Sequence, residues 1–423
     1  MGDPQVSTRV LDNGLTIVVQ EMSHVQSAAI TMLLPAGSVY DPPARSGTAA
    51  LLAEMMPRGA GGMDARGLSS ALDNLGVQRS VTAGVSHITF SAAMTADRLL
   101  DAIPLTAAMV LLPHLDLDLF PAAQNLVRQT LHALEDEPQL LLGQHLRRCS
   151  YPSPWNNPSA GTLEQISDIT CEDIRRFFET SVRPDDTIVG VAGNVSTEAV
   201  FAAFDSELNG WPSGTCPAID EGRPESSPLH VEHDSAQTHI GLAWPSVPYS
   251  HDRYFDAWAA VSILSGGMSS RLFTRVREKR GLCYTISASL HTLQHEARIL
   301  GYAGTTNDRA QETLDAMVLE IRGLSVDLTE DELRRCKAQA KSALIMQQES
   351  TSARSASLAR DIWHLGRVLL PEDIHSRINR ISLEDVYRYA VDYAPEEMTL
   401  VTLGPEALDA VCLVPQADAV TRC

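Results

Sequence analysis

The sequence predicts an α+β fold made of two homologous halves, each a mostly antiparallel sheet with helices packed on one face. Three observations predict it: a segment repeated half a chain apart, a mixture of strand-like and helical segments without strict β–α–β alternation, and a stretch rich in Pro, Gly and Ser near the middle. The chain has 423 residues, which at about 100–200 residues per domain allows two to four domains.

The repeat occupies residues 171–194, CEDIRRFFETSVRPDDTIVGVAGN, and residues 383–405, LEDVYRYAVDYAPEEMTLVTLGP. Each copy begins with an acidic turn, continues as an amphipathic helix, passes through a turn that contains proline and ends as an apolar strand that stops at glycine. The order of these parts is the same in both copies. We therefore predict that the chain arose by duplication.

A linker is predicted between the two copies. Residues 208–228, LNGWPSGTCPAIDEGRPESSP, have no hydrophobic periodicity and are rich in turn-forming residues. We expect an N-terminal domain over residues 1–209, a linker over 210–228 and a C-terminal domain over 229–423.

Strands and helices follow from the local pattern. Alternating or β-rich segments predict strands over residues 27–41, 77–94 and 285–304, and a hairpin over 10–22 with its turn at Asn13-Gly14. Period-3.6 patterns predict helices over residues 46–56, 64–76, 96–112, 120–148 and 270–280.

Composition and charge exclude several classes of function. The net charge of −20 and the pI of about 5.0 repel phosphate groups, so we expect no nucleic-acid partner and no docking on an anionic membrane. No run approaches the roughly 18 apolar residues of a membrane span, and the N-terminus lacks the pattern of a signal peptide. The seven cysteines include no C-x-x-C pair, which favours a reducing compartment. We expect a cytoplasmic protein.

The residues that bind metal in other proteins are not clustered in the sequence. Neither H-E-x-x-H nor H-x-x-E-H occurs. His291 and His295 are four residues apart, but the strand pattern around them predicts a hairpin whose turn leaves both solvated. His230 and His233, just after the linker, are equally weak metal candidates. Cys283 has no base nearby that would activate it as a nucleophile, so we interpret it as a packing residue.

Residues 263–286, ILSGGMSSRLFTRVREKRGLCYTI, resemble the second-half motif of the insulinase/pitrilysin-type zinc peptidases (inverted zincins), in their mitochondrial-processing-peptidase-like branch. The shared pattern is G-G-x-S-S-R-L-F followed by R-E-K-x-G-L-x-Y. The opening segment NGLTIVV, the segment AGSVYDPPARSGTAALLAEMMPRG and the first repeat copy are similar to the same family. The resemblance covers nearly the whole chain and implies duplicated processing-peptidase-like domains.

The chain departs from this family at the zinc motif. Active members carry H-x-x-E-H on the first helix, where the two histidines coordinate zinc and the glutamate activates water, and a downstream glutamate completes the site. The matching window here is ALLAE, with Ala50, Ala53 and Glu54 at the three positions. Gln129 and Thr130 occupy the region of the downstream glutamate. The resemblance therefore implies no catalytic residue, metal ion or other cofactor in this chain.

The second-half feature of the family is present. In the family, an arginine and a tyrosine seven residues apart reach across an enclosed chamber to the zinc site of the other half, and they match Arg277 and Tyr284. A guanidinium and a phenol both donate hydrogen bonds, so the pair fits a role in binding a peptide carbonyl and stabilising its oxyanion. The alternative is structural: Arg277 as a surface cation paired with Glu278 or Asp308, and Tyr284 as a core residue.

The residues around this pair have simpler interpretations. Lys279 and Arg280 are predicted to be solvated. Gly266 and Gly267 allow a tight loop ahead of the helix, and Ser269 or Ser270 is predicted to cap that helix. No Lys-Ser/Thr follows the glycines at the spacing of a phosphate-binding loop.

The resemblance leaves three functions open. The first is a non-catalytic, substrate-binding subunit of a heterodimeric zinc metallopeptidase, which is inactive alone and is paired with a homologous subunit that carries the zinc motif and the zinc. Its substrates would be extended peptides, laid as an added strand on a sheet edge of that partner. The second is a structural subunit, like the members of this family found in respiratory complexes. The third is a homodimer that binds peptides without hydrolysing them.

Overall fold

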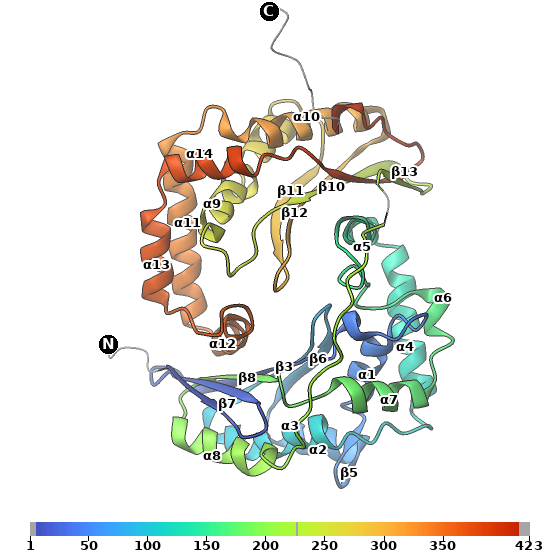
Figure 1. Cartoon of the computed structure of the whole chain (residues 1–423), viewed down its shortest axis with the longest axis vertical. Coiled ribbons are helices and arrows are strands. Elements are labelled where there is room, and N and C mark those ends of the chain that lie inside the picture. Colours follow the sequence, from blue (N-terminus) through green and yellow to red (C-terminus); the bar gives the residue numbers. More distant parts are fainter. Residues whose placement is uncertain (1–5, 226, 414–423) are drawn as a thin grey trace, which may run out of the picture. The chain divides into compact units, whose positions relative to one another are not determined.

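The computed structural model describes residues 6–225 and 227–413, and its two large sheets and their helices are drawn in Figure 1. A third, two-stranded sheet joins β4 (Gly59–Ala60) and β5 (Met63–Asp64). One large sheet has six strands in the order β1-β2-β8-β3-β7-β6, and the other has five in the order β11-β12-β10-β13-β9. The six strands are β1 (Val6–Val10), β2 (Thr16–Glu21), β3 (Ser27–Leu34), β6 (Gln78–Ala83), β7 (Ile88–Thr95) and β8 (Ile188–Gly193). The five strands are β9 (Leu229–Glu232), β10 (Gln237–Pro245), β11 (Thr285–Thr292), β12 (Ala297–Thr306) and β13 (Thr399–Gly404).

Each sheet belongs to one of two compact units. The first unit combines residues up to 133 with residues 153–222 and 345–368, and the second combines residues 134–152, 223–344 and those from 369 onward. Helices lying wholly or mostly in the first unit are α1 (Thr48–Met55), α2 (Ala65–Asn74), α3 (Leu99–Leu111), α4 (Phe120–Glu135), α6 (Leu163–Ile166), α7 (Cys171–Ser181), α8 (Thr197–Leu208) and α12 (Thr351–Leu365). Those of the second unit are α5 (Pro138–Ser150), α9 (Tyr254–Ser265), α10 (Ala310–Arg322), α11 (Glu330–Gln348), α13 (Pro371–Arg380) and α14 (Leu383–Asp392).

The predicted fold class is confirmed, and the duplication extends to strand order. Each large sheet contains one parallel pair, β2 with β8 and β9 with β13, and its other pairs are antiparallel. When the strands are counted from each parallel pair outward, the order β2-β8-β3-β7-β6 in the first sheet corresponds strand by strand to β9-β13-β10-β12-β11 in the second. The repeated helices α7 and α14 both begin with a capping box, formed by Thr170 with Asp173 and by Ser382 with Asp385.

Local sequence explains most of the elements. The predicted hairpin at Asn13-Gly14 is confirmed, because β1 pairs antiparallel with β2 and Gly14 has a φ of 93°, which a residue with a Cβ rarely adopts. The helical region 120–148 consists of two helices, and Pro138 lies in the first turn of the second, where its missing N–H costs no hydrogen bond. Residues 210–228 form no helix or strand in the described part.

The two chain halves exchange one helix each, which the sequence did not predict. Helix α5 comes from the first half but packs on β10 and β13 of the second unit, whereas α12 comes from the second half and packs on β8 and β3 of the first (Figure 1). Val18 and Ala192 face α12, where Leu358 joins them in a separate apolar cluster. Neighbouring strand residues such as Ile17 and Val19 belong to the main core on the other face. Both faces of this sheet are therefore covered, so the prediction that helices pack on one face only is wrong for this unit.

Polar contacts fix α12 on its sheet. The guanidinium of Arg354 donates to the side-chain oxygen of Gln20, and the hydroxyls of Thr31 and Ser355 are 2.9 Å apart. Both contacts are buried, so each satisfies polar groups that would otherwise be costly to remove from water.

Gly190 in β8 determines how closely α12 can approach. A Cβ at this position would lie 2.2 Å from the carbonyl oxygen of Ser355. We expect Gly190→Ala to lower the free energy of unfolding by about 1–3 kcal/mol, because helix and sheet must separate to accept the methyl group. Urea-induced unfolding measures the effect. Gly62→Ala is the matched control, since a Cβ there has no neighbour within 4 Å; equal losses in both variants would contradict the close packing at Gly190.

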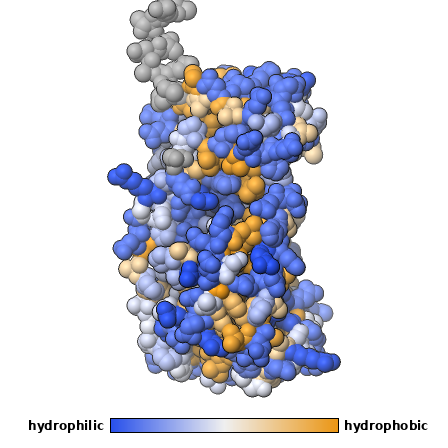
Figure 2. All heavy atoms as spheres, turned by 90° about the vertical axis from the view of Figure 1, so that its right-hand side faces the viewer, coloured by the Kyte–Doolittle hydropathy of each residue, from blue (hydrophilic) through white to orange (hydrophobic). Residues whose placement is uncertain are grey.

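The surface is ordinary for a charged globular protein. On the face drawn in Figure 2, hydrophobic side chains form small groups separated by hydrophilic ones. Within residues 6–225 and 227–413, no helix combines the length and apolar character needed to cross a membrane.

Candidate functional site

The positions predicted to match the family's zinc motif lie on α1 in the first unit, and their side chains do not suit a metal. Ala50 and Ala53 carry only methyl groups, and Ala53 is 4% exposed in the core. The carboxylate of Glu54 accepts a hydrogen bond from Arg58 Nη2 at 2.5 Å. A single carboxylate already paired with an arginine does not form a zinc site. The residues present therefore do not fit the metal that the family implies.

The start of α1 is held by a buried carboxylate. Asp41 accepts hydrogen bonds from the backbone N–H groups of Gly47 and Ala49, both at 2.8 Å. Burial raises the pKa of Asp41 to about 7, although the two N–H donors act in the opposite direction. The first unit thus keeps the backbone arrangement that positions this helix, while the donor atoms of a metal site are missing from it.

Gln129 and Thr130 lie on α4, and both are exposed. The Thr130 hydroxyl donates to the carbonyl of Leu126 one helical turn earlier, at 3.1 Å. Among the residues that the structure describes, no group of three or more His, Cys, Asp and Glu side chains is arranged to hold a metal ion.

Arg277 and Tyr284 lie in the second unit, close to each other along the chain. Arg277 is near the end of a π-helix, Leu272–Glu278, and Tyr284 immediately precedes the edge strand β11. Tyr284 is anchored by its backbone N–H, which donates to Gly304 in β12 at 3.1 Å, while its side chain is 65% exposed. This exposure contradicts the alternative interpretation of Tyr284 as a core residue.

The Arg277 side chain is exposed and oriented by an aromatic ring. Its guanidinium carbon lies 4.6 Å from the centre of the Phe273 ring, a cation–π arrangement that restricts the side chain without using its N–H donors. Within the described residues, Arg277 forms no ion pair, so the predicted pairing with Glu278 or Asp308 is absent. The exposed phenol and the exposed guanidinium are both available as hydrogen-bond donors.

The π-helix is fixed to the rest of the unit by Arg271, which is 2% exposed. Its guanidinium donates to the Glu332 carboxylate at 2.8 and 3.1 Å. It also donates to four backbone carbonyls, those of Gly323, Leu324, Val326 and Asp327. All five N–H donors therefore have acceptors, and the segment that carries Arg277 cannot rotate without breaking them.

The turn between the π-helix and β11 has a defined shape. Gly281 has a φ of 62°, and Arg309 Nη1 donates to its carbonyl at 2.6 Å. Lys279 and Arg280 are exposed, as predicted. Cys283 is buried, and burial raises the pKa of its thiol to about 11 against the opposing charge of Arg277, so it is a packing residue.

Two predictions near this site are wrong. Ser270 does not cap the helix through its side chain; its hydroxyl donates to the Gly267 carbonyl at 2.6 Å, and the π-helix has no side-chain cap. His291 is not a solvated turn residue. It lies within β11, its Nδ1 is 2.8 Å from the Tyr151 hydroxyl, and burial lowers its pKa to about 4.

The other histidines also differ from metal ligands. His295 is exposed in the turn after β11, and His291 and His295 therefore do not share a helix face. His230 Nδ1 lies 2.9 Å from the Thr402 hydroxyl. Sequence reasoning missed Phe273 and Arg271, although both lie inside the S-S-R-L-F motif; an arginine beside two apolar residues was the only local signal that it might be buried.

Two family models match the chain. The model of insulinase (peptidase family M16) matches residues 16–162, and the model of the peptidase M16 inactive domain matches residues 168–340. Together they cover well over half of the chain.

Curated relatives match along nearly the whole length. The uncharacterized zinc protease YmxG of Bacillus subtilis (strain 168) is 24% identical over 401 residues, which is 93% of this chain and 97% of the relative. An uncharacterized zinc protease of Rickettsia felis is 25% identical over 404 residues, or 94% of this chain and 97% of the relative.

Solved structures have the same fold. The peptidase M16 inactive domain from Pseudomonas fluorescens has a TM-score of 0.86 at 21% identity, covering 96% of this chain and 99% of that one. A chain of complex III2 from Candida albicans with Inz-5 bound has a TM-score of 0.82 at 17% identity, covering 95% and 96%. By sequence and by fold, the chain belongs to the insulinase family, peptidase family M16, and lacks the family's zinc motif.

Proposed function

We propose that this chain is the non-catalytic, substrate-binding subunit of a heterodimeric zinc metallopeptidase. Its partner is a homologous subunit that carries H-x-x-E-H and the zinc ion. This chain contributes Arg277 and Tyr284, which bind the peptide and stabilise the negative charge that develops on its carbonyl oxygen.

One contrast supports the proposal. At the positions matched to the zinc motif only the carboxylate of Glu54 remains, and Arg58 pairs with it. Arg277 and Tyr284 are nevertheless exposed, at the end of an anchored π-helix and just before an edge strand. Within the described residues Arg277 forms no ion pair, so both exposed side chains have donors free for a ligand. A chain without any role in peptide hydrolysis would not require both an exposed Arg277 and an exposed Tyr284.

The two side chains suit a carbonyl oxygen. The guanidinium offers several N–H donors in a fixed plane, and the phenol offers one O–H donor. Donors aimed at the position of the developing oxyanion stabilise the transition state more than the substrate. The partner's zinc would activate water and polarise the same bond.

A structural role is the second candidate function, because a chain of Candida albicans complex III2 has the same fold. The second role predicts no dependence of hydrolysis on Arg277 or Tyr284. A homodimer that only binds peptides, the third possibility, predicts binding without cleavage in every combination.

The decisive experiment compares three preparations: this chain alone, a zinc-motif homologue from the same organism alone, and the two mixed. Hydrolysis of a quenched fluorescent peptide mixture is the readout. We expect cleavage in the mixture and little or none with this chain alone, even with added zinc. Replacing the glutamate of the partner's H-x-x-E-H with glutamine is the control that places the chemistry on the partner.

Zinc-dependent hydrolysis by this chain alone would overturn the proposal. Equal activity of the partner with and without this chain would favour the structural role instead. Formation of the mixed complex is checked separately by size-exclusion chromatography, so that a failure to associate is distinguished from a failure to activate.

A further inference from the structure

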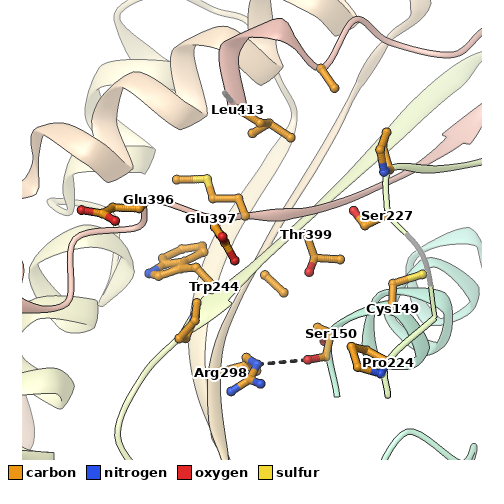
Figure 3. A pocket seen from close by; sticks show the side chains of 15 residues that line it. Cys149, Ser150, Pro224, Ser227, Trp244, Arg298, Glu396, Glu397, Thr399 and Leu413 are labelled. Carbon is orange, nitrogen blue, oxygen red and sulfur yellow. Dashed lines mark hydrogen bonds between the residues drawn. The ribbon is translucent and has the colours of Figure 1, made fainter. Parts of the chain in front are cut away.

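A pocket of about 510 Å³ opens at the end of the five-stranded sheet, where β13 begins (Figure 3). Its lining comes from the end of α5, from Pro224, Ser227 and Pro228, from the end of β10 and Arg298 of β12, from residues 396–399 around the start of β13, and from Ala410 and Leu413. All these residues belong to the second unit. The pocket contains none of the residues proposed above for peptide hydrolysis, so its role is a separate question.

Most of the wall is apolar. Trp244, Met398 and Leu413 line it together with alanine and proline side chains. Volume and lining fall in the range of pockets that bind small molecules, in which a few polar groups fix the orientation of the ligand. The nature of those polar groups therefore identifies the class of ligand.

The first polar group is a buried hydroxyl without a partner. Ser150, the last residue of α5, is 5% exposed and lines the pocket. Among the described residues, its Oγ has no hydrogen-bond partner. A buried hydroxyl left without a partner is unfavourable by about 1–3 kcal/mol, so such groups are usually satisfied by a ligand or by water.

The second polar group is one edge of a guanidinium. Arg298 Nε donates to the Ser150 carbonyl at 3.0 Å, the contact drawn in Figure 3. Its Nη1 donates to the Ala297 carbonyl at 2.9 Å and lies 2.7 Å from the Glu296 carboxylate. Within the described residues, Nη2 makes no such contact. The guanidinium is thus held in place by three acceptors and keeps two N–H donors for an anion.

The third polar group is a carboxylate. Figure 3 shows the Glu397 carboxylate between Trp244 and Thr399, whereas the side chain of Glu396, which also lines the pocket, extends in the opposite direction; both glutamates are exposed. Glu397 forms no ion pair among the described residues, and in particular none with Arg298. The pocket therefore presents a guanidinium whose charge is paired with Glu296 but whose Nη2 is open, and an exposed carboxylate that does not pair with it.

We propose that this pocket binds an α-amino acid with a large apolar side chain. The ammonium group of the ligand pairs with the Glu397 carboxylate. Its carboxylate accepts hydrogen bonds from Arg298 Nη2 and from the Ser150 hydroxyl. Its side chain lies against Trp244, Met398 and Leu413. A ligand with both charges pairs with the Glu397 carboxylate and also accepts from Arg298 Nη2, which neither a simple amine nor a simple acid does.

Calorimetric titration of the full chain with L-phenylalanine tests the proposal. We expect saturable binding of L-phenylalanine, and binding weaker by about tenfold or more for 2-phenylethylamine and 3-phenylpropanoate, since each lacks one of the two charged groups. Equal binding of all three compounds would show a merely apolar pocket. No binding of L-phenylalanine at millimolar concentration would overturn the proposal.

Variants separate the pocket from effects on folding. Glu397→Gln is expected to weaken L-phenylalanine binding by about tenfold. Glu396→Gln, which removes an equal charge from the adjacent residue, is the matched control and should leave the affinity unchanged. Ser150→Ala should weaken binding without lowering the stability of the ligand-free chain, because its hydroxyl has no partner to lose. Equal losses in Glu396→Gln and Glu397→Gln would contradict the site, and urea unfolding of each variant checks the fold.

Discussion

In the complex with a zinc-bearing partner, Arg277→Ala is expected to lower kcat by about 10²–10³-fold, the size of effect that follows removal of one oxyanion donor. The interaction is made fully only in the transition state, so KM should change much less than kcat. Steady-state kinetics of the purified heterodimer on one fluorescent peptide give both values. Tyr284→Phe, which removes a single hydroxyl and keeps the ring, should lower kcat in the same direction.

Arg280→Ala is the matched control for this prediction. Arg280 carries the same charge and is exposed three residues further along the chain, so it tests whether charge alone is responsible. We expect it to leave kcat within about twofold, since an exposed and solvated charge contributes little. If Arg277→Ala and Arg280→Ala behave alike, or if neither changes the activity of the mixture, the proposed role of the pair is wrong and the structural role gains support.

Arg271→Ala is expected to lower the free energy of unfolding by about 3–5 kcal/mol, the range for removing one partner of a buried ion pair. The substitution leaves the Glu332 carboxylate, 13% exposed, without its cation. It also leaves four backbone carbonyls without a donor. Urea-induced unfolding followed by circular dichroism measures the loss. Arg334→Ala provides the control, because Arg334 is 76% exposed and pairs with Asp331 on the surface; we expect a change within about 0.5 kcal/mol.

The pH dependence of the same variant is a second readout. Burial acts to raise the pKa of Glu332, but the hydrogen bonds and charge of Arg271, with the bonds from Thr329, outweigh it and hold that pKa below its ordinary 4.5. In the wild type the resulting stability is present above pH 4.5 and is lost as the pH falls below it. Without Arg271, burial raises the pKa of Glu332 instead of lowering it. Ionisation of this carboxylate at neutral pH then lowers the stability of the variant. The stability difference between the two proteins should therefore be larger at pH 7 than at pH 4, and an equal difference at both would contradict the ion pair.

Much of the fold follows from local sequence. The Asn13-Gly14 turn, the acidic first turns of the two repeated helices and the alternation of 77–94 depend on neighbours only a few residues away, and the structure confirms each of them. The exchange of α5 and α12 is different. An amphipathic helix pattern shows that a face is buried but does not say which sheet buries it, and the decisive contacts join residues more than 300 positions apart, such as Gln20 and Arg354.

The candidate site likewise has features that the sequence shows and features that only the structure shows. The loss of metal ligands is visible in the sequence, because alanine at positions 50 and 53 has no donor atom in any fold. Whether Arg277 and Tyr284 are buried, paired or exposed is not visible there. The structure decided against a core position for Tyr284 and against an ion pair for Arg277, and it replaced the predicted serine-capped helix with a π-helix held by Arg271.

By itself, then, the sequence determined the α+β class, the duplication and the lack of donor atoms at Ala50 and Ala53, because composition, periodicity and donor atoms are local properties of the chain. Only the tertiary structure decided which helix covers which sheet, what holds Arg277, and how Ser150, Arg298 and Glu397 come to line one pocket. Those features depend on contacts between segments that are distant in the sequence. The hydrophobic effect is non-directional, so a short apolar segment does not specify which other segment will cover it.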